Sequence, residues 1–161
     1  MHEFKERHPL ATDLLVLAAG ASMPLAFAPF GFWPLAILLP VVLTWSWDHA
    51  GPGRAARRGG LFGLGQFGFG IYWIYISLHD YGGAPAPFAA LATSAVVLVL
   101  ALYPALCGWL LCRWGPPPGP IRWLLFLPAS WTLLEWVRSW LLTGFPWLAP
   151  GYSQIDAPLG Q

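Results

Sequence analysis

Charged residues are scarce in this sequence. Only 9% of its 161 residues are Asp, Glu, Lys or Arg, while 57% are hydrophobic. A soluble globular domain carries about 25% charged residues, so this chain has too little polar surface to cover a water-soluble body. The formal net charge of +1 argues against nucleic acid as a partner, because no basic face is available to neutralise phosphates. The composition therefore predicts a membrane protein whose main surroundings are the bilayer.

Cysteine is also scarce, which limits the kinds of site that can be present. Cys107 and Cys112 lie five positions apart in one apolar stretch, so neither a disulfide framework nor a metal-ligand spacing is found. We interpret both as small apolar residues of a helix. Residues 63–68 match the glycine pattern of dinucleotide-binding proteins, but no strand precedes them, so nucleotide binding is not expected. No cofactor is predicted.

The sequence does contain long apolar stretches, and basic residues occupy alternate gaps between them. Seven of the eight Lys and Arg residues form three clusters, namely Lys5 with Arg7, then Arg54, Arg57 and Arg58, and finally Arg113 with Arg122. The intervening gaps at 28–34 and 79–85 contain neither residue type. Because positive charge stays on the cytoplasmic side during insertion, this pattern predicts five crossings with the N-terminus inside and the C-terminus outside.

The predicted fold is an all-α, polytopic bundle of transmembrane helices. The crossings are expected at about 10–28, 33–47, 61–78, 85–112 and 121–143, and residues 144–161 are expected at the outer face. Residues 48–60 are expected to form a polar inner loop. The first stretch resembles a signal peptide, but Pro29 would follow the cleavage position, so an uncleaved helix is expected. The second stretch is short and contains Pro40, which makes it the least secure crossing.

The third stretch has a face of small residues. Gly59, Gly63, Gln66 and Gly70 follow spacings of four, three and four, so they share one side of a helix. Small residues let a second helix approach closely, and the Gln66 amide can hydrogen-bond across that contact. This face is therefore predicted to be a helix-packing surface.

Two ionisable residues lie inside the fifth stretch. Glu135 and Arg138 are three positions apart and so share a helix face. One interpretation is an ion pair that ties this helix to its neighbours; the other is a polar lining for an amphiphile with a charged head, such as a phospholipid. Both remain open. The neighbouring pair His79 and Asp80 is interpreted chiefly as solvation of a helix end.

The segment 143–156 is the most distinctive part of the chain. Pro146 and Pro150 prevent a helix, and the rings of Phe145, Trp147 and Tyr152 suit the headgroup region. The segment is interpreted either as an interfacial aromatic belt or as a binding element that presents aromatic walls, together with Gln154 and Asp156, to a lipid.

Several of these residues also carry a family resemblance. The runs in question are Gly144-Phe-Pro-Trp-Leu, Gly151-Tyr-Ser-Gln-Ile-Asp156, Glu135-Trp-Val-Arg138-Ser-Trp, Leu25-Ala-Phe-Ala-Pro29 with Trp33-Pro34, and Gly70-Ile-Tyr-Trp-Ile-Tyr-Ile-Ser-Leu78 followed by Gly82-Gly83. Together they resemble bacterial apolipoprotein N-acyltransferase, in family order and over almost the whole chain.

The resemblance implies a multi-pass enzyme of the bacterial inner membrane that acts in lipoprotein maturation. Its expected partners are a phospholipid, as the acyl donor, and a diacylated lipoprotein, whose N-terminal amine on diacylglyceryl-cysteine accepts the chain. Members of the family use a Glu-Lys-Cys triad in a nitrilase-like domain at the outer face, where an activated thiolate forms a thioester with the acyl group.

This sequence departs from the family pattern at the triad. Its only lysine is Lys5, on the predicted inner side, and Cys107 and Cys112 lie in the fourth stretch. No catalytic residue is therefore assigned, and the chain is expected to be the membrane portion of a longer enzyme, or a truncated reading frame, that is inactive alone. The candidate substrate-binding residues are Glu135, Arg138, Phe145, Trp147, Tyr152 and Gln154.

Two alternatives remain open. The chain could be a stand-alone, non-catalytic membrane module, such as an assembly partner or a small transporter. Gly59, Gly63 and Gly70 would then form an intermolecular packing face. The second alternative is a related acyltransferase that acts on another amine.

Overall fold

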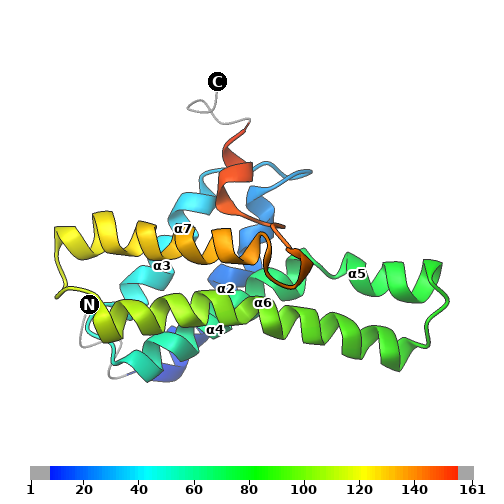
Figure 1. Cartoon of the computed structure of the whole chain (residues 1–161), viewed down its shortest axis with the longest axis horizontal. Coiled ribbons are helices and arrows are strands. Elements are labelled where there is room, and N and C mark those ends of the chain that lie inside the picture. Colours follow the sequence, from blue (N-terminus) through cyan, green and yellow to red (C-terminus); the bar gives the residue numbers. More distant parts are fainter. Residues whose placement is uncertain (1–7, 156–161) are drawn as a thin grey trace.

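The computed structural model describes residues 8–155, and every regular element in that range is a helix (Figure 1). The longer elements are α2 (Pro9–Ser22), α3 (Leu35–Trp47), α4 (Pro52–Gly70), α6 (Ala86–Trp114) and α7 (Leu127–Arg138). The shorter ones are η1 (Met23–Ala26), α5 (Trp73–Ile76), η2 (Ser77–Tyr81), η3 (Arg122–Phe126), η4 (Leu141–Thr143) and η5 (Pro150–Gln154). The all-α prediction is confirmed for these residues. Lys5, Arg7 and Asp156 lie outside the described range.

Two helical stretches are long and apolar enough to cross a membrane, Pro9–Ala26 and Ala86–Trp114. A third is obtained if Pro52–Gly70 and Trp73–Tyr81, which meet at a bend of 45°, are counted as one broken span. The remaining two predicted crossings correspond to shorter helices, the 13-residue α3 and the 12-residue α7 with the five-residue turn η3 before it. The number and direction of the crossings stay predictions.

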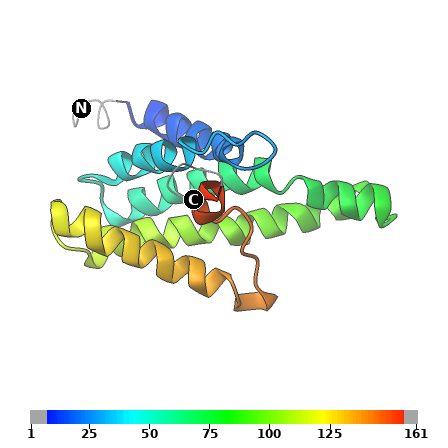
Figure 2. The same cartoon turned by 90° about the horizontal axis from the view of Figure 1, so that it is seen from above.

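The long helices lie side by side, with α4 and α6 in the middle. α4 packs mainly against α6 and α2, whereas α7 packs on α6 at the far side from α2 (Figure 2). The largest core cluster joins α2, α3, α4 and α6 and includes the fully buried side chains of Leu43, Trp47 and Phe62. The helices therefore bury one another's apolar faces around α4.

Glycines bring α4 into backbone contact with both of its neighbours. A Cβ atom on Gly59 would lie 2.2 Å from the Pro104 carbonyl oxygen, and one on Gly63 would lie 2.7 Å from Ala101 Cα, both on α6. On the other side, a Cβ on Gly65 would lie 2.4 Å from the Leu17 oxygen of α2. The contact with α2 was not predicted, although Gly65 belongs to the glycine pattern at 63–68; its role here is close helix packing.

The helix expected at 61–78 differs from the structure at both ends. α4 begins at Pro52, because Gly51 is extended and a proline in the first turn of a helix loses no hydrogen bond. Most of the expected inner loop at 48–60 is therefore helical. The helix then breaks at Ile71, where φ is −122° and ψ is 19°, after a stretch rich in glycine, a residue with low helix propensity.

The helix expected at 121–143 also ends early, at Arg138. Leu142, Thr143 and Gly144 have φ values of 54°, 76° and 81°, which a right-handed helix does not permit. The chain turns back there, so that residues 144–155 lie over the middle of the bundle and beside the turn that follows η1 (Figures 1 and 2).

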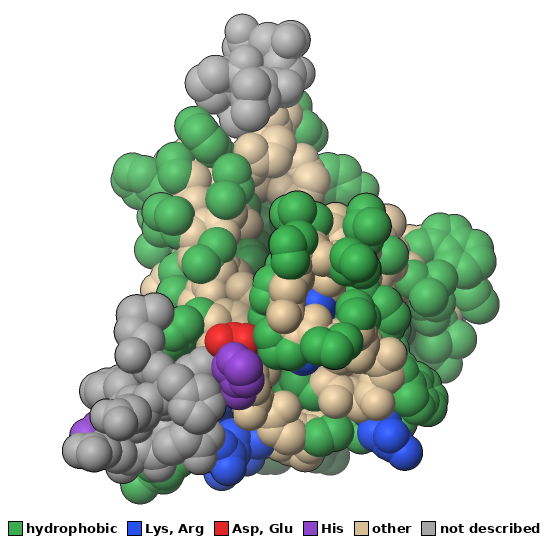
Figure 3. Space-filling view, turned by 90° about the vertical axis from the view of Figure 1, so that its left-hand side faces the viewer, with side chains coloured by type: hydrophobic (Ala, Val, Ile, Leu, Met, Phe, Trp, Pro, Cys, Tyr) green, Lys and Arg blue, Asp and Glu red, His purple; other side chains and the backbone are tan. Residues whose placement is uncertain are grey.

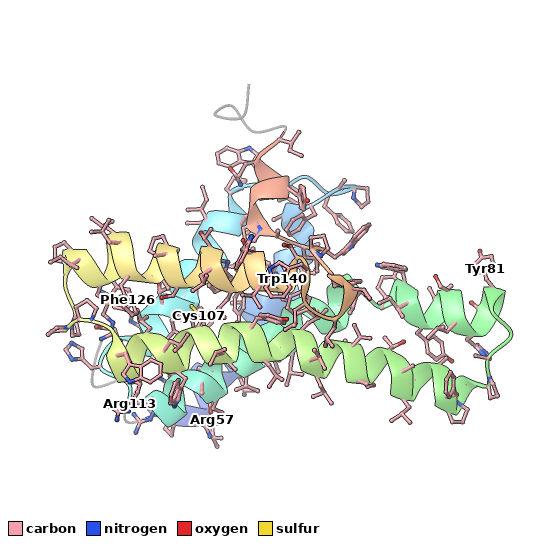
Figure 4. All side chains as sticks on the ribbon, in the orientation of Figure 1. Arg57, Tyr81, Cys107, Arg113, Phe126 and Trp140 are labelled. Carbon is pink, nitrogen blue, oxygen red and sulfur yellow. The ribbon has the colours of Figure 1, made fainter. Side chains whose placement is uncertain are left out.

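An arm made of α5, η2 and the first part of α6 projects beyond the other helices (Figures 1 and 2). Tyr81, which is 86% exposed, lies at its tip (Figure 4). The imidazole Nδ1 of His79 lies 2.8 Å from the Ala84 carbonyl oxygen and so closes the turn at the tip. The arm thus projects beyond the segment at 144–155, because α5 and η2 continue past the end of α4 (Figures 1 and 2).

Candidate functional site

The end of α7 holds a buried arginine. The Arg138 side chain is 4% exposed, and its Nη1 donates hydrogen bonds to the carbonyl oxygens of Phe145 at 3.1 Å and Trp147 at 2.7 Å. Its Nη2 lies 3.7 Å from Oε1 of Glu135, and its guanidinium lies 5.4 Å from the centre of the Phe67 ring. Arg138 therefore holds the segment after α7 in place, with Glu135 balancing its charge.

Gln66 holds the same segment from the side of α4. Its Nε2 donates a hydrogen bond to the Leu148 carbonyl oxygen at 3.2 Å, and both groups are buried. The Leu148 side chain occupies the space over Gly70, where a Cβ atom would lie 2.1 Å from Leu148 Cδ1. The predicted small-residue face thus has two partners, because Gly59 and Gly63 meet α6 whereas Gln66 and Gly70 meet the segment at 145–148.

The aromatic residues of this segment form a partly exposed surface. Trp147 is 52% exposed, and its ring lies 5.6 Å from Trp73 on α5 and 6.4 Å from Phe145. Tyr152 is 57% exposed on η5. The surface therefore joins the base of the arm to the C-terminal segment.

Gln154 is placed apart from the other predicted site residues. Its Nε2 lies 3.5 Å from the Trp33 carbonyl oxygen and 2.9 Å from the Ser153 hydroxyl. These contacts connect η5 to the turn between η1 and α3, so Gln154 helps to hold residues 150–154 in place.

Two hollows meet at Arg138. A small cavity between α4, α6 and α7 is mainly apolar and has three polar or charged residues in its wall; it is lined by Gln66, Phe67, Tyr103, Pro104, Cys107, Trp131, Leu134, Glu135 and Arg138. An apolar groove of about 370 Å³ runs between α6 and residues 141–145, and Tyr103 and Arg138 line both hollows. Sequence reasoning missed Phe67, Tyr103 and Trp131, because nothing local distinguishes a cavity-lining aromatic residue from a lipid-facing one.

The arrangement combines an ion pair, an amide and several aromatic rings with an apolar groove. The Gln66 amide and Arg138 Nη1 already bind backbone oxygens, so the groups left to meet a ligand are the Glu135 carboxylate, the aromatic rings and the groove. Cys107 lines the cavity but is 1% exposed. Within residues 8–155, no three His, Cys, Asp or Glu side chains gather in a way that could hold a metal ion.

Comparison with known proteins shows the family of the chain. The family described as apolipoprotein N-acyltransferase N-terminal domain matches residues 19–161. Curated relatives named apolipoprotein N-acyltransferase include those of Methylococcus capsulatus, 48% identical over 91% of this chain, Vibrio cholerae, 45% over 94%, and Azotobacter vinelandii, 49% over 91%. These alignments span only 29%, 30% and 29% of the respective relatives. Because the family match covers most of its length, the chain belongs to the apolipoprotein N-acyltransferase N-terminal domain family.

Proposed function

We propose that this chain is the membrane-embedded part of an apolipoprotein N-acyltransferase, which transfers an acyl chain from a phospholipid to the N-terminal amine of diacylglyceryl-cysteine in lipoproteins. The relatives carry that name, and the runs at 135–140 and 144–156 carry the resemblance. The observation that carries the proposal is the position of the Glu135–Arg138 pair, where a small, mainly apolar cavity meets an apolar groove beside exposed aromatic rings.

Within this proposal, the site residues divide into two roles. Arg138 and Gln66 are positioning residues, because their hydrogen bonds go to the carbonyl oxygens at 145, 147 and 148. Phe145 and Trp147 line the substrate path, with Tyr152 at its exposed rim, and the groove at 95–100 accepts an acyl chain. The family's Glu-Lys-Cys triad has no counterpart among the candidate site residues, so the 161-residue chain alone is expected not to transfer acyl groups.

We further propose five crossings in the bacterial inner membrane, with the N-terminus inside. The basic residues support this orientation, because Arg57 and Arg113 lie at the end of the bundle opposite Tyr81 (Figure 4). The test is the accessibility of single cysteines, Gly53→Cys and Gly151→Cys, introduced after replacement of Cys107 and Cys112 by alanine. A membrane-impermeant thiol reagent added to spheroplasts is expected to label position 151 and to leave position 53 unlabelled. Labelling of both positions would overturn the orientation.

The binding role is tested with a phospholipid that carries a diazirine in its acyl chain. The 161-residue chain is reconstituted with this probe, irradiated and digested, and cross-links are expected to concentrate at 95–103 and 141–147. Cross-links spread evenly over all exposed apolar helix faces would contradict the proposal that this groove binds the acyl chain.

The catalytic role is tested in the enzyme encoded by the extended reading frame, with a diacylated lipopeptide as acceptor. Trp147→Ala is expected to lower N-acylation while the protein still inserts into the membrane. Turnover equal to that of the unaltered enzyme would remove Trp147 from the site. Absence of N-acylation by the unaltered enzyme would favour a non-catalytic membrane module.

A further inference from the structure

A second buried polar cluster lies at the opposite end of the bundle, away from the candidate site. Asp13 of α2 accepts hydrogen bonds from two arginines of α4, Arg57 through Nη2 and Arg58 through Nε at 3.2 Å. Arg58 Nη1 also donates to the Ser46 carbonyl oxygen at 2.6 Å. Arg58 Nη2 is buried and has no hydrogen-bond partner among the described residues. One carboxylate therefore serves two guanidinium groups, and one buried donor is left over.

The cluster carries one more positive than negative charge, and of its two arginines only Arg57 is exposed to the surroundings. The Arg58 side chain is 1% exposed, so no molecule from outside can reach it without moving the helices. The Arg57 side chain is 54% exposed although it also contacts Asp13. The uncompensated positive charge is therefore presented to the surroundings by Arg57.

The whole end of the bundle has the same imbalance. Its described residues include five arginines (Arg54, Arg57, Arg58, Arg113 and Arg122) and two aspartates (Asp13 and Asp48), a surplus of three positive charges when the histidines are neutral. Its histidines are His8 and His49. Figure 3 looks at this end, and arginine side chains appear along its lower edge on a largely apolar surface. Leu10 and Leu14, near Asp13 on α2, are 75% and 66% exposed, so hydrocarbon can reach the cluster along this helix.

We propose that Arg57, with Asp13 and Arg58 behind it, binds the phosphate of an anionic phospholipid at this end of the bundle. A guanidinium offers two parallel N–H donors that match the oxygens of a phosphate, and basic sites at the ends of membrane helices attract anionic lipids. The exposed apolar face of α2 receives the acyl chain. A zwitterionic headgroup fits less well, because it adds a cation where positive charge is already in surplus. This site is independent of the acyl-transfer proposal and of which leaflet it faces.

The experiment compares lipids that differ only in the headgroup. The 161-residue chain in detergent is titrated with phosphatidylglycerol or with phosphatidylcholine of the same chain length, and bound lipids are counted by native mass spectrometry. Phosphatidylglycerol is expected to bind about tenfold more tightly. Arg57→Gln is expected to reduce this preference about fivefold, the effect of one cation close to an anionic lipid surface. Arg57→Lys is expected to keep part of it.

Arg113→Gln is the matched control, because it removes the same charge at the same end but outside the cluster with Asp13. Its effect is expected to be less than half that of Arg57→Gln. Equal losses in the two variants would mean a diffuse attraction and would overturn the proposed site. Displacement of the lipid by millimolar inorganic phosphate would also overturn it, since the site would then bind free anions. Circular dichroism of each variant checks that Arg57→Gln leaves the helices folded.

Discussion

Arg58 and Arg138 are both buried arginines next to a carboxylate, but they connect different parts of the molecule. The carboxylate of Arg58 comes from Asp13, 45 residues away on another helix, and its second bond goes to the end of a third helix at Ser46. The carboxylate of Arg138 comes from Glu135, three residues earlier on the same helix. Its remaining donors bind two carbonyl oxygens of a segment without regular structure, at Phe145 and Trp147.

Because of this difference, we expect Arg58 to affect the stability of the whole bundle and Arg138 to affect the conformation of the candidate site. An arginine whose partners lie on two other helices fixes how the three helices pack, so its loss should lower the stability of the whole bundle. An arginine whose charge is balanced by a residue of its own helix can donate its other hydrogen bonds to a loop. Its loss should therefore loosen that loop and leave the helix packing unchanged. The cluster of Asp13, Arg57 and Arg58 should therefore control global stability, and the Arg138 cluster should control the local order of the candidate site.

The largest expected effect is the loss of the carboxylate shared by Arg57 and Arg58. Asp13→Asn leaves the buried Arg58 without a counter-charge, which should lower the free energy of unfolding by about 3–5 kcal/mol. The measurement is reversible unfolding in detergent micelles. Asp48→Asn is the control, because the Asp48 side chain is 34% exposed, and it should cost less than about 1 kcal/mol. Equal decreases in the free energy of unfolding of the two variants would contradict the role of Asp13 as the counter-charge of the buried Arg58.

A second prediction concerns the backbone contact beside Arg58. Gly59→Ala should lower the free energy of unfolding by about 1–3 kcal/mol, because its Cβ atom would lie 2.2 Å from the Pro104 oxygen and the helices must move apart. Gly151→Ala in the C-terminal segment is the matched control, since nothing lies within 4 Å of its Cβ position. The control should change stability by less than about 0.5 kcal/mol. A neutral Gly59→Ala would show that α4 and α6 tolerate separation.

The comparison predicts a local effect for Arg138. Arg138→Met should cost about 1–2 kcal/mol, because two carbonyl oxygens and Glu135 lose their partner. Amide hydrogen exchange should accelerate at 144–149 and stay unchanged in α2 and α4. Arg138→Lys should restore little of the protection, since one ammonium group cannot reproduce the planar fork in which Nη1 serves both oxygens while Nη2 faces Glu135. Faster exchange throughout the bundle would contradict the proposed division between the two arginines.

The smallest expected effect is at Gln66. Gln66→Leu removes one buried hydrogen bond to the Leu148 oxygen, which should cost about 1 kcal/mol and loosen residues 147–149 in hydrogen exchange. Gln154→Leu provides the comparison, because its bond to the Trp33 oxygen is long, at 3.5 Å, and should contribute less. A greater loss from Gln154→Leu would mean that η5, rather than α4, holds the segment in place.

Part of the site was accessible to sequence reasoning, and part was not. The spacing of Glu135 and Arg138 predicted that the two share a helix face, and one of the two open interpretations was an ion pair. In the structure the two side chains lie 3.7 Å apart. The pair lies within one helix, and Arg138 binds the segment after that helix through the Trp147 carbonyl oxygen. No partner was predicted for Asp13, which lies 8% exposed between two arginines.

By itself, the sequence determined the helical class, the approximate positions of the apolar stretches and the clustering of basic residues, since each depends on composition and short-range spacing. Only the tertiary structure decided the partner of Asp13, the glycine contact between α2 and α4, the break after Gly70 and the turn of the chain beyond Arg138. These features depend on which backbones approach each other and on which buried donors and acceptors then need partners. A carboxylate and a guanidinium 45 positions apart carry no local signal of their pairing until the helices have packed.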